Sequence, residues 1–166
     1  FKDQMPPQGA EQECVSEFSD EALDRAFEAF SRFVQTLPKD GPIQTPVDEQ
    51  LTTYALYKQA TLGPCTRPKP SLFHPIERVK WHAWNRLGDM PRREAKRIYV
   101  ENFIKRTERN YEKYQKELPA WMADKKYEEV KAFAKAHKDD FGVTYLRTPQ
   151  GLKEVSVIGK EIGFEL

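Results

Sequence analysis

Prolines limit the length of every regular element that this chain can form. Seven of its twelve prolines fall between Pro38 and Pro75, and four of these seven lie in the segment from Gly63 to Pro75. Proline lacks a backbone N–H and disfavours the α region for the residue before it, so this segment is predicted to be an extended loop. The chain is therefore expected to fold as several helices separated by loops.

Between these breaks, apolar side chains recur at three- and four-residue steps, which is typical of helices with one buried face. Ser19 followed by Asp20 and Glu21 predicts the N-cap of the first helix, and Thr45-Pro46 predicts the start of the second. The predicted helices span residues 19–37, 46–60, 76–87, 91–116 and 120–138.

The end of the chain has a different pattern. Apolar residues alternate on both sides of the tetrapeptide Thr148-Pro149-Gln150-Gly151, which is typical of a short β-hairpin. We therefore predict an all-α protein with three parts. These are an irregular arm over residues 1–18, a helical bundle over 19–116, and an extension over 117–166 that holds the additional helix and the hairpin.

The length of 166 residues is enough for one hydrophobic core. The sequence has no apolar run near the roughly 18 residues that a membrane span requires, so no transmembrane helix is expected. Cys14 and Cys65 are too few for a disulfide framework and wrongly spaced for zinc, so no metal site is expected. This cysteine usage predicts a reducing intracellular compartment, either the cytosol or the mitochondrial matrix. The start at Phe1 indicates either a trimmed chain or a processed mature protein, and the second interpretation gives a slight preference for the mitochondrial matrix.

Charge is segregated along the chain, although the formal net charge is only +1. Residues 1–50 carry 4 basic and 11 acidic side chains, whereas residues 51–109 carry 13 basic and 5 acidic ones; residues 110–166 are balanced. The middle block is therefore expected to attract an anionic ligand. The near-zero total argues against a general polyanion binder, and no nucleic-acid-binding motif accompanies the basic block.

Aromatic and basic residues share helix faces within this middle block. Tyr54, Tyr57 and Lys58 are spaced i, i+3 and i+4, and Lys80 with Trp81 opens a second cluster. Phenol hydroxyls and ammonium groups can donate to phosphate oxygens, while a ring offers a stacking surface for a base. Half-buried tyrosines beside a solvated lysine would give the same spacing, so the pattern alone leaves both interpretations open.

Three motifs occur in order and without insertion: Tyr54-Ala55-Leu56-Tyr57-Lys58-Gln59-Ala60-Thr61-Leu62-Gly63, then Lys80-Trp81-His82-Ala83-Trp84-Asn85, then Glu94-Ala95 with Tyr99-Val100. Together they resemble the acyl-CoA-binding protein family over about residues 20–110. The resemblance implies a four-helix bundle that binds long-chain acyl-CoA mainly between its second and third helices, as a carrier in fatty acid metabolism.

The resemblance also implies a role for each matching residue. Tyr54 and Lys58 would bind the 3′-phosphate region of CoA, and Lys80 would supply a second ammonium for the phosphates. The other implied ligand contacts are Tyr57 against the adenine, Trp81 lining the site and Tyr99 near the pantetheine and acyl end, whereas Trp84 would belong to the packing.

The chain also departs from the family pattern. The loop over residues 38–46 is about four residues longer than in minimal members, and Gln35 stands where the family often has a lysine. These changes are expected to alter the preferred acyl length and to leave most of the head-group contacts in place.

Two other functions can be weighed against a carrier. His74, His82 and His137 fall in no nucleophile or metal motif and no Gly-x-Ser-x-Gly elbow occurs, so we expect neither an enzyme nor a cofactor. The stronger alternative is an accessory subunit of a larger assembly, for example a mitochondrial one. Its protein partner would bind residues 1–18 and 110–166, which exceed what a minimal carrier needs.

Overall fold

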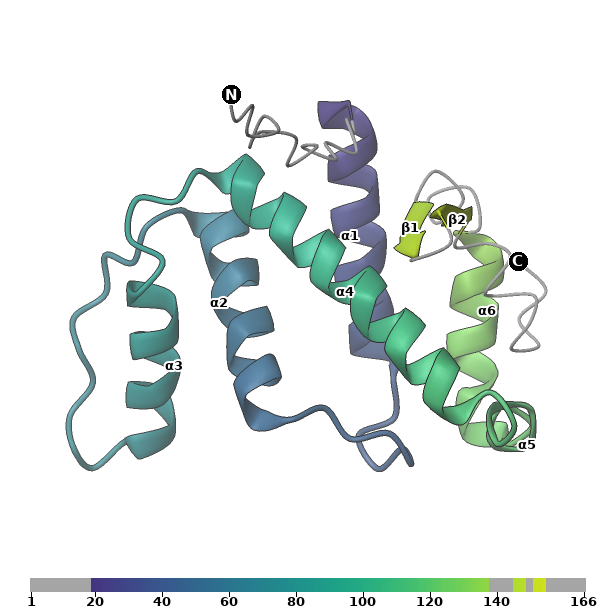
Figure 1. Ribbon diagram of the computed structural model, residues 1–166. Helices are drawn as coiled ribbons and strands as arrows, with labels where there is room; N and C mark the ends of the chain where they lie inside the picture. Colours follow the sequence, from purple (N-terminus) through teal and green to yellow (C-terminus); the bar gives the residue numbers. More distant parts are fainter. Residues whose placement is uncertain (1–18, 138–144, 149–150, 155–166) are drawn as a thin grey trace, which may run out of the picture.

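Four helices, α1 to α4, form the body of the molecule in a computed structural model (Figure 1). The structure describes residues 19–137 and the strand residues 145–148 and 151–154, so the arm predicted over 1–18 and most of the predicted tail lie outside the described residues. The elements are α1 (Asp20–Thr36), α2 (Val47–Leu62), α3 (Pro75–Asn85), α4 (Arg92–Tyr114), α5 (Leu118–Met122), the 3₁₀ turn η1 (Lys125–Tyr127), α6 (Glu128–Ala136), β1 (Tyr145–Thr148) and β2 (Gly151–Glu154).

The core lies where α4 crosses α1 and α2 (Figure 1). Helix α1 begins as predicted, because the Ser19 side chain accepts a 3.2 Å hydrogen bond from the backbone N–H of Ala22. Its buried face stacks on α4, with the rings of Phe30 and Phe103 4.3 Å apart between centroids. The buried residues of this core are Leu23, Ala26, Phe27, Ala29, Phe30, Leu56, Ala60, Ala95, Tyr99, Val100, Phe103 and Ile104.

A buried glutamine, Gln59, connects α2 to α3 and to the turn before α4. The Gln59 side chain of α2 is fully buried and donates to the carbonyl oxygens of Gly88 and Met90, at 3.0 and 2.8 Å. Its Oε1 accepts from the indole N–H of Trp84 on α3, which also donates to the carbonyl of Gly63. Burial of Trp84 in this network agrees with the packing role that the sequence implied.

The predicted single helix over 120–138 is wrong, because the structure divides this segment into α5, η1 and α6. Asp124 takes an extended conformation, and its carboxylate accepts a 3.0 Å hydrogen bond from the backbone N–H of Lys126. This capping contact ends one helical segment and starts the next, while the apolar spacing continues across the break.

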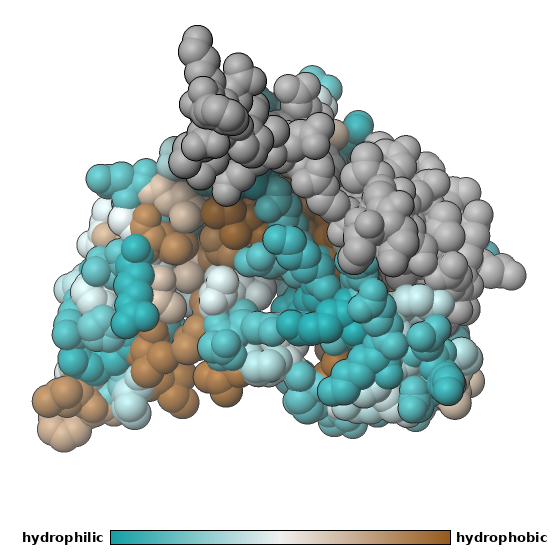
Figure 2. Space-filling model, in the orientation of Figure 1, coloured by the Kyte–Doolittle hydropathy of each residue, from teal (hydrophilic) through white to brown (hydrophobic). Residues whose placement is uncertain are grey.

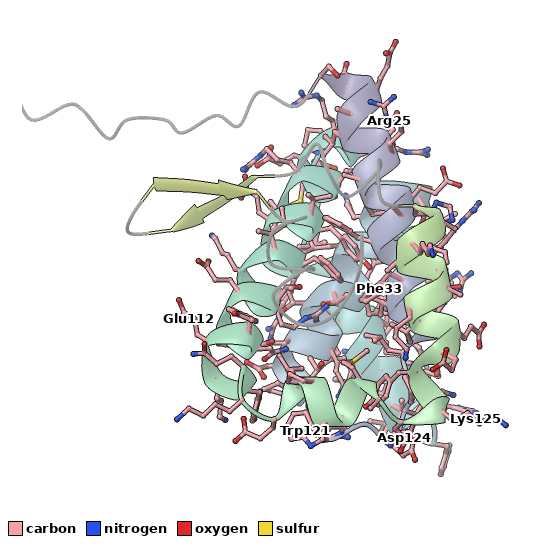
Figure 3. The ribbon with its side chains drawn as sticks, turned by 90° about the vertical axis from the view of Figure 1, so that its right-hand side faces the viewer. Arg25, Phe33, Glu112, Trp121, Asp124 and Lys125 are labelled. Atoms are coloured by element: carbon pink, nitrogen blue, oxygen red, sulfur yellow. The ribbon has the colours of Figure 1, made fainter. Side chains whose placement is uncertain are left out.

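The extension packs back on the bundle over residues 118–136. Val130 and Tyr127 are buried with Ala134 in a second apolar cluster, to which Phe33 of α1 also belongs. The rings of Phe33 and Phe133 lie 6.4 Å apart, and Figure 3 places Trp121, Asp124 and Lys125 at one end of the bundle. The aromatic side chains of this stretch thus make packing contacts within the chain itself.

The predicted hairpin is present. Strands β1 and β2 pair antiparallel with Tyr145 opposite Glu154 and Thr148 opposite Gly151. A helical bundle with an added C-terminal helix and a hairpin confirms the predicted class. Over the described ranges, no helix combines the length and apolarity that crossing a bilayer requires.

Candidate functional site

Two ammonium groups lie against the ring of Tyr54. The Nζ atom of Lys58, one helical turn further along α2, is 5.8 Å from the ring centroid, and the Nζ atom of Lys80 on α3 is 5.6 Å from it. All three side chains are half-buried. Packing of α3 against α2 therefore brings together the three residues that the sequence assigned to the phosphates.

Little negative charge on the protein balances this pair of cations. Lys80 lies 3.5 Å from the carboxylate of Glu77, which is itself largely exposed, and an exposed pair of this kind contributes little stability. Lys58 forms no ion pair with any carboxylate among the residues that the structure describes. The two ammonium groups remain available to an anionic ligand.

A cavity of about 530 Å³ lies between α2 and α3, beside Tyr54 and Lys80. Most of its walls are apolar, and several wall residues are unusually exposed for such side chains: Val47 and Ile76 each retain 70% of their surface and Val79 retains 48%. The lining residues are Val47, Gln50, Leu51, Tyr54, Pro75, Ile76, Val79 and Lys80. An apolar ligand covering these walls would gain from the hydrophobic effect.

A larger cavity of about 790 Å³ lies on the other side of Tyr54. Helices α1, α2 and α4, the loop after α1 and the extension all contribute to its lining. Tyr57 and Tyr99 face it beside polar side chains, among them Ser31, Gln35, Thr53 and Asn110. Tyr54 thus lies between two mainly apolar cavities, of which the larger also carries several polar side chains.

Tyr99 is the most buried of the predicted ligand residues, with 4% of its surface exposed. Its ring meets the edge of Phe27 at 5.0 Å, and Phe27 in turn stacks on Tyr57 at 5.9 Å. Burial raises the pKa of Tyr99 to about 12. Like any tyrosine hydroxyl, that of Tyr99 is protonated at neutral pH, and it can donate a hydrogen bond into the larger cavity.

Arg106 also faces the larger cavity and was missed by the sequence reasoning. Its guanidinium lies 5.7 Å from the ring centroid of Phe103, and burial lowers its pKa. Within the described part of the chain no carboxylate pairs with it, because Glu49 is held by Arg109 through two hydrogen bonds of 2.8 and 2.9 Å. Its spacing of seven residues from Tyr99, on the same helix face, was the available signal.

Trp81 stands apart from the other predicted ligand residues. It lines neither cavity, and its indole N–H donates a 2.8 Å hydrogen bond to the carbonyl of Arg67. The ammonium of Lys69 lies 5.9 Å from its ring centroid. A ligand contact for Trp81 stays a prediction.

The site offers cations, hydroxyl donors and apolar walls. Across the described residues there is no cluster of three or more His, Cys, Asp or Glu side chains with which to hold a metal ion. His82, next to Trp81, has its pKa lowered by desolvation and by the charges of Lys69, Arg78 and Arg86. The combination of cations, hydroxyl donors and apolar walls suits a ligand that has both phosphates and an apolar chain.

Comparisons with known proteins identify a matching family. Residues 24–103 match the family described as acyl CoA binding protein. The chain is 47% identical over 79 residues to acyl-CoA-binding domain-containing protein 5 of Xenopus tropicalis, a match covering 48% of this chain and 17% of that protein. It is 46% identical over 76 residues to acyl-CoA-binding domain-containing protein 4 of Homo sapiens, covering 46% of this chain and 28% of the human protein.

A solved structure shares the fold. The crystal structure of ACBP from Moniliophthora perniciosa aligns with a TM-score of 0.52 and 30% identity, covering 70% of this chain and 95% of the fungal one. By contrast, the matching segment spans only about a sixth of the Xenopus relative and just over a quarter of the human one. The similarity therefore concerns one domain of those longer proteins.

Proposed function

The chain belongs to the acyl-CoA-binding protein family through residues 24–103, and on that premise we propose that it binds long-chain acyl-CoA with the CoA phosphates between Lys58 and Lys80. The observation that carries the proposal is the convergence of both ammonium groups on the Tyr54 ring, at 5.8 and 5.6 Å. Hydrogen bonds from cations to phosphate oxygens are short and strong, and Tyr54 adds a hydroxyl donor.

We assign the acyl chain to the cavity between α2 and α3. Its walls are apolar and exposed, and it begins beside Lys80, which is where a thioester chain leaving the phosphates would enter. Burial contributes about 0.8 kcal/mol per methylene. Affinity is therefore expected to rise with chain length until the cavity is full.

We assign the adenine and its ribose to the entrance of the larger cavity. Tyr57 offers a ring to the base, and Arg106 offers a hydrogen-bond donor at the same wall. Tyr99 also lines this cavity, so the contact with the pantetheine and acyl end that the resemblance implies for it stays a prediction. The walls of this cavity are mainly apolar, and the polar side chains among them offer hydrogen-bonding partners to the base and the ribose. Trp81 would contact the ligand only at the outer edge of α3.

A binding function accounts for these residues without any catalytic step. The phosphate contacts and the apolar cavity each contribute to affinity, which is what a carrier that maintains a pool of acyl-CoA requires. Docking of the extension to another protein stays a prediction.

Isothermal titration calorimetry with hexadecanoyl-CoA tests the proposal. Lys58→Ala and Lys80→Ala are each expected to weaken binding by more than about 1 kcal/mol, roughly fivefold, because each removes a charge-assisted hydrogen bond. Lys105→Ala is the matched control, since Lys105 is an exposed cation on α4 away from both cavities. Wild-type affinity in both the Lys58 and the Lys80 variants would sink the assignment.

A further inference from the structure

Two large apolar side chains project from the loop between α2 and α3. Leu72 retains 77% of its surface and Phe73 retains 91%. Neither residue lines the apolar cavity or the larger one, so the ligand proposed above does not cover them. Figure 2 shows an apolar projection at the lower left, at the base of α3, separate from the hydrophobic surface between α2 and α3.

Local hydrogen bonds hold this projection in place. Ser71 and His74 close a turn around Leu72 and Phe73, with a backbone hydrogen bond of 3.1 Å and a side-chain contact of 3.0 Å. The guanidinium of Arg78 on α3 donates to the carbonyl of Pro70 at 2.9 Å, which ties the loop to the helix. The two apolar side chains are thus presented outward on a fixed turn rather than on a long free loop.

Basic residues are frequent in the chain segment that contains the projection, and Arg78 contacts its loop directly. Residues 64–88 contain Arg67, Lys69, Arg78, Lys80 and Arg86 but a single acidic residue, Glu77. Glu77 lies 3.5 Å from Lys80, so the other cations face little opposing charge from this stretch of chain. Desolvation lowers the pKa of His82, and the charges of Lys69, Arg78 and Arg86 lower it further.

We propose that this turn docks on the surface of a lipid bilayer containing anionic phospholipids, with Leu72 and Phe73 inserted among the lipids and the nearest cations, Lys69 and Arg78, at the phosphates. Apolar side chains bordered by Lys and Arg are the combination that binds an anionic membrane interface. The projection is convex, so it suits insertion into a deformable lipid surface better than a flat contact with a folded acidic protein.

Docking in this orientation has a consequence for the ligand site. Ile76 and Val79 follow the turn directly along the chain and line the apolar cavity, so the mouth of that cavity would face the lipid. An acyl chain could then pass between bilayer and protein with little exposure to water. This consequence rests on the proposed function, whereas the docking itself does not.

Vesicle sedimentation of the whole chain without acyl-CoA tests the docking. We expect the protein to sediment with vesicles of phosphatidylcholine and phosphatidylserine, to do so less at high salt, and to remain in solution with phosphatidylcholine alone. The double variant Leu72→Ser with Phe73→Ser is expected to reduce the bound fraction by about tenfold or more. Leu62→Ser is the matched control. Leu62 is an apolar residue with half of its surface exposed, but it is the last residue of α2, at the end of that helix away from the projection (Figure 1).

The measurements distinguish a failure of the docking proposal from a failure of the proposed acyl-CoA binding. Equal sedimentation of the wild type and the double variant, or no sedimentation of the wild type with anionic vesicles, overturns the docking proposal. Helical circular dichroism and unchanged calorimetric affinity for hexadecanoyl-CoA show that the double variant is folded, since neither residue lies in the ligand site. A wild type that binds vesicles but not acyl-CoA would overturn the proposed function and leave the docking in place.

Discussion

The Oε1 atom of Gln59 accepts a 3.1 Å hydrogen bond from the indole Nε1 of Trp84, twenty-five residues further along the chain. The amide nitrogen of the same side chain donates to the carbonyls of Gly88 and Met90. One buried amide therefore fixes α3 and the turn before α4 against α2. Because Lys58 precedes Gln59 and Lys80 lies one turn before Trp84, this network also sets the position of both ligand-directed cations.

Gln59→Leu is expected to destabilise the fold strongly. Leucine has a similar size, but the substitution leaves the Trp84 N–H with one acceptor fewer and the carbonyls of Gly88 and Met90 without this donor in a buried site. The expected loss is about 2–3 kcal/mol in the free energy of unfolding, measured by urea denaturation. Gln115→Leu, at an exposed position, is the control and should change it by less than about 0.5 kcal/mol.

Val79→Phe is expected to shorten the preferred acyl chain. Val79 is half exposed and lines the apolar cavity, so a larger side chain can be accommodated but occupies ligand space. Calorimetry across a series of acyl-CoA esters should show affinity lost for hexadecanoyl-CoA, at about 0.8 kcal/mol per displaced methylene, and retained for octanoyl-CoA. A uniform loss at every chain length would place the acyl chain elsewhere.

Arg106→Leu is expected to lower ligand affinity without lowering stability. Removing a half-buried cation that has no carboxylate partner among the described residues relieves a desolvation cost, so the unfolding midpoint should stay the same or rise. Acyl-CoA affinity should fall by about 1 kcal/mol through loss of a donor in the larger cavity. Lower stability with unchanged affinity would show a purely structural role.

A matched arginine provides the control for that experiment. Arg109 is exposed on the same helix and pairs with Glu49, whose pKa this hydrogen bond lowers. Arg109→Leu should therefore reduce the free energy of unfolding by less than about 1 kcal/mol and leave ligand affinity unchanged.

Tyr99 should make the fold sensitive to alkaline pH. Its pKa is about 12 in the folded protein, against about 10 in an unfolded chain. Above about pH 10 the unfolded chain releases this proton while the folded protein keeps it, so the free energy of unfolding declines as the pH rises from about 10 toward 12. Below that range the contribution of Tyr99 is constant.

Urea denaturation at a series of alkaline pH values measures this effect. Tyr99→Phe should flatten the decline, and spectrophotometric titration of that variant should lack the most alkaline tyrosinate transition. Tyr114→Phe, which leaves Tyr99 in place, should show the wild-type decline. An unchanged slope in Tyr99→Phe would contradict the prediction.

Features that depend on neighbouring residues were predictable from the sequence. The Ser19 cap, the extended loop after Gly63 and the amphipathic helices arise from local backbone chemistry and spacing. The break at Asp124 was not predicted, because the apolar period continues across it and hides a capping carboxylate. Apolar spacing therefore predicts the helices of this chain well, but it does not predict the breaks within them.

Features that depend on distant partners needed the structure. Trp81 and Trp84 lie on the same short helix, yet only Trp84 is buried, because Gln59 and Gly63 of another segment accept from it. In the sequence, Arg106 cannot be distinguished from the other basic residues of α4. Only the structure shows that the nearby carboxylate of Glu49 is hydrogen-bonded to Arg109 instead. The candidate phosphate site was easier to predict, since two of its three residues share one helix.

Two parts of the chain that are far apart in sequence form one wall of the larger cavity. Lys126 in the extension lies 3.8 Å from the carboxylate of Asp40, and a side chain built at Gly41 would come within 3.2 Å of the Tyr127 hydroxyl. The loop after α1 and the extension thus pack against each other. In evolutionary terms, they are expected to be gained or lost together, and a relative lacking the extension should also have the shorter loop.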